Sequence, residues 1–389
     1  MKRLLTFFLI CFSFVEYTRA EDIINYKYWD EGKLTWDDFQ DTLSLKGVPS
    51  AFNAFLRIEK TEKRDGNTRT IRPEAQACFD KRHSFADRQI QNENLLRLFQ
   101  LKYDLLEMYR RRLQTELNLG VVGIAADNRT RQYMDLYTEQ SKKAEQETEN
   151  GQNEIKLQEW EFYVTKELIE NPAPSIPRIS PRRFGYGFYL GTGASFPVGS
   201  IADYWDPAWQ INVGFDLAYA NTHLLCDFSA GTARTRQEII VSNGQITDKW
   251  LRNGHNTYTS ISLGIGQQLI STKYFALMPY VGCIWSGYSD QAKIQEGRNE
   301  RTTLSYTNFN WTAGICFDYR FSTTISLVPS FWRGHREIFT ASIRTKLFIN
   351  REQFHNFKIA PDDNGSMLRG CKLGFSVACL GFSRLLQIK

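Results

Sequence analysis

In the second half of the chain, large apolar side chains alternate one by one with small or polar ones. Residues 184–196 read FGYGFYLGTGASF, and the same alternation recurs at 209–219 and 309–319. Successive side chains of a strand point to opposite faces, so a period of two predicts strands. In a water-soluble sandwich the polar face meets solvent and has no reason to be small. In a narrow barrel within lipid, large apolar side chains face hydrocarbon and small or polar ones fill the interior, which is the pattern here.

Nine segments carry this alternation. The other six lie at 224–231, 259–266, 275–286, 324–331, 339–347 and 371–379. Each is roughly ten residues long, as a tilted strand that crosses a bilayer requires. A single-chain bacterial barrel has an even number of strands, so we predict eight, with ten as the alternative. A secreted all-β domain is the other interpretation of the pattern.

The connections between these segments also alternate in length. Short ones at 220–223, 271–274 and 320–323 separate long polar ones at 232–257 and 287–303. Short periplasmic turns and long outer loops are typical of outer-membrane barrels. In architecture, residues 184–389 resemble the small outer-membrane β-barrels of the OmpA/OmpX type.

The N-terminus places the protein outside the cytosol. Residues 1–20, MKRLLTFFLICFSFVEYTRA, have a basic start, an apolar run and small residues before a cleavage position, which is typical of a signal peptide. Without this segment the formal charge of +5 falls to +3, and no Lys/Arg block stands out. Nucleic acid is therefore not an expected partner. The six remaining cysteines show no metal-ligand spacing.

A Pro-rich stretch at 171–183, NPAPSIPRISPRR, predicts an extended linker. Before it, residues 21–170 are charged and helical, with a hairpin expected to turn at Asp65-Gly66. The predicted fold class is multidomain: a helix-rich α+β soluble domain, then an antiparallel transmembrane β-barrel in residues 184–389.

Residues 28–170 resemble a family of secreted bacterial domains regarded as zinc-metalloprotease-like. The matches are Leu34-Thr35-Trp36-Asp37-Asp38-Phe39, Cys78-Phe79-Asp80, Leu95-Leu96, Gln100, Asp104, Glu107, Arg111, Glu147-Thr148, Gly151 and Trp160. The family's long helix carries H-E-Q-x-H, in which two histidines bind zinc and the glutamate is the general base.

The metal motif of that family is lost in this chain. Leu98, Phe99 and Lys102 stand where the first histidine, the glutamate and the second histidine would be, and Asn150 replaces a further family histidine. Leucine and phenylalanine cannot bind Zn²⁺, and an ammonium group would repel it. We therefore expect no metal, no cofactor and no hydrolytic zinc site.

Two acidic positions of the family are retained, Asp104 and Glu107. The resemblance implies a binding role for them. The alternative is a solvated or salt-bridged surface, since Glu107 can pair with Arg110 or Arg111 one helical turn away.

Six charged residues fall on the predicted lumenal face: Asp216, Asp227, Asp318, Arg344, Lys346 and Lys372. Three acids and three bases in a narrow barrel predict mutual charge compensation. A hydrolase that uses these carboxylates with His223, His255 or His335 is the alternative.

These observations predict a non-enzymatic bacterial outer-membrane protein. Its barrel would sit in outer-membrane lipid, and its periplasmic domain, which resembles an inactive zinc protease, would bind or scaffold a periplasmic or outer-membrane protein partner. The alternatives are a hydrolase in the barrel and a narrow ion channel. An eight-stranded barrel is just wide enough for its own side chains, which argues against the channel.

Overall fold

The computed structural model describes residues 25–41, 49–242, 247–290, 305–328, 336–354 and 368–388. The expected signal peptide at 1–20, His335 and most of the expected connection 287–303 lie outside these residues. The chain divides into two compact units, one of residues 1–61 and 73–177 and one of residues 62–72 and 178–389. Each unit is described by itself.

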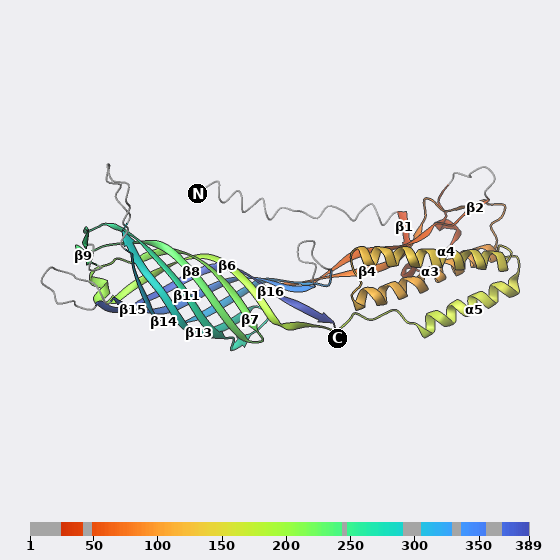
Figure 1. The fold of residues 1–389 in the computed structure, drawn as a ribbon. Helices are drawn as coiled ribbons and strands as arrows, with labels where there is room; N and C mark the ends of the chain where they lie inside the picture. The colour runs from red at the N-terminus through yellow and green to blue at the C-terminus, as the bar shows by residue number, and fades with distance from the viewer. Residues whose placement is uncertain are drawn as a thin grey trace. The chain divides into compact units, whose positions relative to one another are not determined.

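Eight antiparallel strands close into a ring in the second unit (Figure 1). In ring order they are β6 (Ile179–Gly199), β7 (Ala208–Tyr219), β8 (Thr222–Arg234), β11 (His255–Gln267), β13 (Phe275–Asp290), β14 (Ser305–Ser326), β15 (Glu337–Phe354) and β16 (Leu368–Ile388). Pairing of β16 with β6 completes the ring. A closed ring leaves no free strand edge, because every strand has two neighbours.

The nine expected segments correspond to eight strands, because two of the segments belong to one continuous strand. Segments 309–319 and 324–331 both contribute to β14, so residues 320–323 are not a turn. The register of β14 against β15 shifts between Arg320 and Ser322, and such a bulge breaks the alternation that marks a continuous strand. Strand β6 also begins earlier than expected, at Ile179 within the predicted linker.

Large apolar side chains point outward from the ring along every strand. Residues so exposed include Phe184, Phe188, Leu190, Trp209, Ile211, Phe215, Leu217, Phe228, Ile261, Ile265, Val281, Trp285, Trp311, Ile315, Phe317, Leu347, Leu373 and Val377. Their neighbours in sequence are buried in the lumen, as Gln210, Asn212 and Asp216 are on β7. This orientation of the two faces is the one that the alternation predicts.

Short elements complete the end of the barrel that carries the long connections. They are the 3-10 helix η3 (Ser200–Asp203) and the paired strands β9 (Ile239–Ser242) and β10 (Thr247–Trp250). A buried apolar cluster lies among them: Ile201, Trp205, Ala208, Ala233, Ile239, Trp250, Tyr258 and Tyr288. At the opposite end, β12 (Ile270–Ser271) pairs with β13.

The second unit also contains the tip of a hairpin from the first part of the chain. Strands β3 (Ala54–Asp65) and β4 (Thr68–Asp80) form this hairpin, and residues 68–71 pair in parallel with residues 323–326 of β14. The Asn67 side chain donates to the carbonyls of Lys273 and Arg320, at 3.2 and 3.0 Å. The tip thus extends the barrel sheet beyond its ring.

The first unit contains three α-helices, α3 (Glu93–Leu119), α4 (Ile124–Glu147) and α5 (Glu154–Glu170). Its short elements are β1 (Tyr26–Tyr28), η1 (Trp29–Glu31), η2 (Trp36–Asp38), β2 (Ser50–Ala51) and β5 (Phe85–Ala86). The Asn92 side chain caps α3 by accepting from the Leu95 amide at 2.8 Å, which satisfies one of the free donors of the first turn. Buried side chains of α3 form the centre of the unit's apolar core.

The predicted fold class is wrong. Strands account for 55% of the structure, and the described residues hold three α-helices rather than a helix-rich domain followed by a separate barrel. Strand β4 belongs to the same 12-stranded sheet as the ring strands. The reason is the parallel pairing of residues 68–71 with β14, because pairing between segments so far apart in the chain leaves no local pattern.

Among the helices that the structure describes, none combines the length and the hydropathy needed to cross a membrane.

Candidate functional site

The barrel lumen holds the predicted charged residues in three clusters, one above another. In the first, Arg344 is fully buried and donates to both oxygens of Asp318, at 2.7 and 2.9 Å. It also donates to Asp216 at 2.8 Å, whose other oxygen lies 2.7 Å from His223 Nδ1. One guanidinium therefore compensates two carboxylates, which is the geometry that its planar donors favour.

The second cluster centres on Lys346. Its ammonium lies 2.7 Å from Asp227 and 4.9 Å from the centre of the Tyr280 ring. The Tyr189 ring lies between this cluster and the first, 5.6 Å from Lys346 and 5.3 Å from Arg344. Aromatic faces attract cations, so these rings help to hold the two charges where water is scarce.

The third cluster pairs Lys372 with an acid that the sequence analysis missed. Glu352 lies 3.1 Å from the Lys372 ammonium and accepts from Ser286 at 3.0 Å. The rings of Tyr258 and Tyr288 lie 3.6 and 4.3 Å from the same ammonium. Glu352 falls on the same face of β15 as Arg344 and Lys346, and this parity was the signal that could have identified it.

Polar side chains pack against one another in the described part of the lumen. A cavity of about 30 Å³ lies beside Asp227, Lys346, Asn212 and Ser229, which is room for one or two water molecules. Tyr189 Oη, His223 Nε2 and Arg344 Nη1 have no hydrogen-bond partner within the described chain. The described lumenal side chains therefore form a packed polar core.

The histidines do not form a hydrolytic site with the described residues. His223 contacts Asp216, but no hydroxyl or thiol has a recorded hydrogen bond to its ring within the described ranges, and a nucleophile needs its base within hydrogen-bond reach. His255 stands at the exposed start of β11. In the described part of the chain, no group of His, Cys, Asp and Glu side chains could hold a metal ion.

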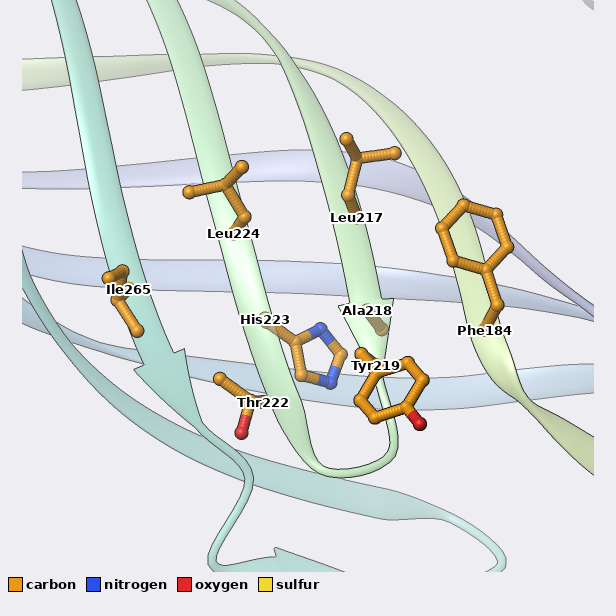
Figure 2. A pocket seen from close by; sticks show the side chains of 8 residues that line it. All are labelled: Phe184, Leu217, Ala218, Tyr219, Thr222, His223, Leu224 and Ile265. Atoms are coloured by element: carbon orange, nitrogen blue, oxygen red, sulfur yellow. The ribbon is translucent and has the colours of Figure 1, made fainter.

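The outer wall carries an open apolar hollow of about 300 Å³ near the β7–β8 turn. Figure 2 shows the side chains that line it: Phe184, Leu217, Ala218, Tyr219, Thr222, His223, Leu224 and Ile265. Its lining is almost entirely apolar, so it offers no arrangement of polar groups that could orient a reacting molecule.

Leu98, Phe99 and Lys102, which the resemblance aligned with a zinc motif, are part of the apolar core of the first unit or pack against it. Leu98 and Phe99 are buried, and the Phe99 ring stacks on Phe52 with centres 5.5 Å apart. Lys102 is also buried, 2.5 Å from Glu145 and above the Phe52 ring at 4.7 Å. Asn150 is exposed in the turn after α4 with φ of 57°. These side chains surround no open cleft, because aromatic rings and an ion pair fill the space.

Of the two acidic residues, Glu107 is buried and Asp104 is half-buried, and Glu107 forms the ion pairs that its sequence spacing predicts. Glu107 is 2% exposed and pairs with both Arg110 and Arg111, at 2.6 and 2.8 Å. Asp104 accepts from Trp29 Nε1 at 2.8 Å and Gln100 Nε2 at 2.7 Å. Burial raises the pKa of Asp104 above its ordinary value, although both hydrogen bonds act to lower it. These contacts tie η1 to α3.

Comparisons with solved structures find similarity to outer-membrane β-barrels. One match is Ail, the attachment invasion locus protein of Yersinia pestis, in complex with the heparin analogue sucrose octasulfate. The identity is 12% and the TM-score is 0.28, and the match covers 52% of this chain and 99% of Ail. The structure also matches the N-terminal β-barrel domain of Pseudomonas aeruginosa OprF at 10% identity and a TM-score of 0.22, over 52% and 99% of the two chains.

A major outer membrane protein from Thermus thermophilus matches at 12% identity and a TM-score of 0.24, over 51% of this chain and 98% of that one. Likenesses at these scores carry no argument about what this chain binds or does. No protein-family model and no curated protein matches the sequence, so the resemblance to zinc-protease-like domains has no support from these comparisons.

Proposed function

We propose that this protein is a non-enzymatic outer-membrane barrel that anchors its N-terminal unit in the bacterial periplasm. The observation that carries the proposal is the outward apolar face of the ring. Side chains such as Phe188, Phe215, Ile261 and Ile315 are about half exposed on strands whose other face is polar and packed. In water, exposed apolar area of this extent is unfavourable, whereas in hydrocarbon it is the expected surface.

Chain direction supports the proposed topology. Strand β6 enters the barrel and β16 leaves it at the end with the short connections β7–β8 and β11–β13. In outer-membrane barrels that end faces the periplasm. The linker before β6 would then hold residues 25–177 on the periplasmic side.

The N-terminal unit would act by binding protein and not by catalysis. Its retained acids are satisfied by internal partners, so they are not free to bind a substrate. One helix of the unit presents apolar side chains to solvent, which is a feature of protein-binding surfaces.

Membrane fractionation and protease treatment test this function. We expect the protein in the outer-membrane fraction and resistant to extraction by carbonate. Protease added to intact cells should cut within 232–257 or 287–303 and leave residues 21–170 intact until the outer membrane is opened. Recovery in the soluble fraction, or cutting of the N-terminal unit in intact cells, would contradict the proposal.

A further inference from the structure

Helix α5 is apolar on two opposite faces. Leu157, Trp160 and Val164 are buried in the core of the first unit. On the other side, Ile155, Phe162 and Ile169 are 72%, 73% and 74% exposed. A helix with a single docking partner needs one apolar stripe, so the second stripe has no function in the core.

The exposed stripe has the spacing of a helix-pairing seam. Its three residues are seven positions apart, and seven residues make nearly two complete turns. They therefore lie almost in a line along α5. Apolar residues repeated every seven positions are the seam of paired helices.

The order of the residues fits a second copy of the same helix. Ile155 and Ile169 lie at equal distances on either side of Phe162. In an antiparallel pair with Phe162 at the two-fold axis, Ile155 of each copy meets Ile169 of the other. A symmetric interface of this kind uses one surface patch twice.

The charges beside the stripe agree with this arrangement. Glu159 and Lys166 flank the stripe on the same side, three residues before and four after Phe162. The antiparallel pair brings Glu159 of one copy beside Lys166 of the other, twice. A parallel pair would instead bring Glu159 near Gln158 and Glu161, without opposite charges. Within one copy, Glu159 pairs with Lys156 at 2.7 Å and Lys166 pairs with Glu170 at 3.8 Å. Both ion pairs are exposed, so they are weak and can be exchanged for pairs with a second copy.

The helix composition disfavours a lipid surface as the occupant. Within residues 154–170 there are five glutamates and two lysines. Helices that lie on membranes carry Lys and Arg on the polar face, and an acidic helix is repelled by anionic headgroups.

We propose that the Ile155–Phe162–Ile169 face of α5 is a self-association surface, which joins two copies of this chain through an antiparallel α5–α5 pair. The inference rests on the proposed protein-binding role of the N-terminal unit and names its partner. Confinement of the chain to a membrane would raise the effective concentration for so small an interface.

Charge exchange tests the proposal on the full chain in detergent by sedimentation equilibrium. Glu159→Lys and Lys166→Glu should each weaken the dimer about tenfold or more, because like charges then face each other twice. The double variant should restore wild-type dimerisation. Lys142→Glu on α4, an exposed lysine away from the stripe, is the matched control and should leave dimerisation unchanged. A chain that is monomeric at every concentration, or single variants with wild-type dimerisation, would overturn it.

Engineered cysteines test the direction of the pair. In a variant whose exposed Cys226 and Cys379 are alanine, Ile155→Cys combined with Ile169→Cys should give a disulfide-linked dimer under mild oxidation. Ile155→Cys alone should not, since Ile155 meets Ile169. Crosslinking through Ile155→Cys alone indicates a parallel pair and overturns the proposal, as does failure of the double variant to crosslink. A monomeric chain in the outer membrane would refute the self-association inference and leave the proposed membrane function standing. A dimer in the soluble fraction would refute the membrane function and leave the self-association inference standing.

Discussion

At the scale of single residues, Phe99 and Lys102 of α3 are held by packing and by an ion pair. The Phe99 ring lies 5.2 Å from the Phe39 ring and 5.5 Å from that of Phe52. Lys102 extends the same cluster with its charge balanced by Glu145. These contacts stabilise the unit and leave no position for a metal or a reacting group between them.

Phe99→Ala should therefore destabilise the first unit by about 3–5 kcal/mol, as truncation of a buried phenylalanine does. Lys102→Ala should cost less, on the order of 1 kcal/mol, because Glu145 is still able to reach water. Hydrogen exchange of the α3 amides in the full chain measures both changes. Chelator should leave the exchange rates unaltered, and metal-dependent protection or a harmless Phe99→Ala change would refute this account of the helix.

The raised pKa of the half-buried Asp104 predicts a pH dependence of stability. Its pKa is raised by burial, so the folded state holds the proton more tightly than the unfolded state does. The stability of the unit should fall as pH rises through the interval from the ordinary aspartate pKa to the raised value, and the penalty should persist above it. Asp104→Asn should remove this slope from the exchange of α3 amides. An unchanged slope in the variant would assign the pH dependence to another group.

At the scale of elements, each barrel strand separates lipid-facing from lumenal residues by alternation alone. On β7, Phe215 is 54% exposed, while the adjacent Gly214 faces the ring of Tyr189. A Cβ atom at Gly214 would lie 2.2 Å from Tyr189 Cζ, so the lumen has no room for a side chain there.

Phe215→Arg should lower the free energy of unfolding of the barrel by about 2–4 kcal/mol, because it places a charge in hydrocarbon. Gly214→Arg should fail through steric overlap with Tyr189. Heat-modifiable migration on gels reports the folded fraction of each variant. Normal assembly of Phe215→Arg together with tolerance of Gly214→Arg would show that the two faces are reversed.

The side chain of Asn67 contributes to the attachment of the hairpin tip, beside the backbone pairing of residues 68–71 with β14. Asn67→Ala removes two hydrogen bonds, to the carbonyls of Lys273 and Arg320, and should loosen the pairing of residues 68–71 with β14 by about 1–2 kcal/mol. Faster hydrogen exchange in residues 68–71 would report this loss. Asp65→Ala removes only an exposed ion pair with Lys273 and serves as the control with little effect. Equal protection in both variants would mean that backbone pairing alone holds the tip.

At the scale of the whole molecule, strands predominate in the described structure, and the hairpin of β3 and β4 has residues in both compact units. The interior of the barrel holds three charge clusters, a small cavity and an apolar cluster of Trp205, Trp250, Tyr258 and Tyr288. This packing agrees with the proposed role as an anchor.

The packed interior predicts no steady ion conductance when the protein is inserted in a planar lipid bilayer. The cavity of about 30 Å³ is too small for a continuous water column. Current recordings of the purified chain should match those of the protein-free bilayer. Reproducible single-channel steps would show that the lumen opens.

Local sequence pattern was sufficient for much of this molecule. Alternation assigned the two faces of strands such as β7, and it placed Asp216, Arg344 and Lys346 on the lumenal side, because strand geometry fixes which residues share a face.

Tertiary structure alone decided the rest. The bulge at Arg320 hid the continuity of β14, and the parallel docking of residues 68–71 overturned the predicted fold class. Sequence pattern also did not show which acid compensates which base, such as the pairing of Lys372 with Glu352. These features depend on register and on contacts between distant segments. A one-dimensional pattern does not record them, because the same alternation is compatible with many registers until the closed ring selects one.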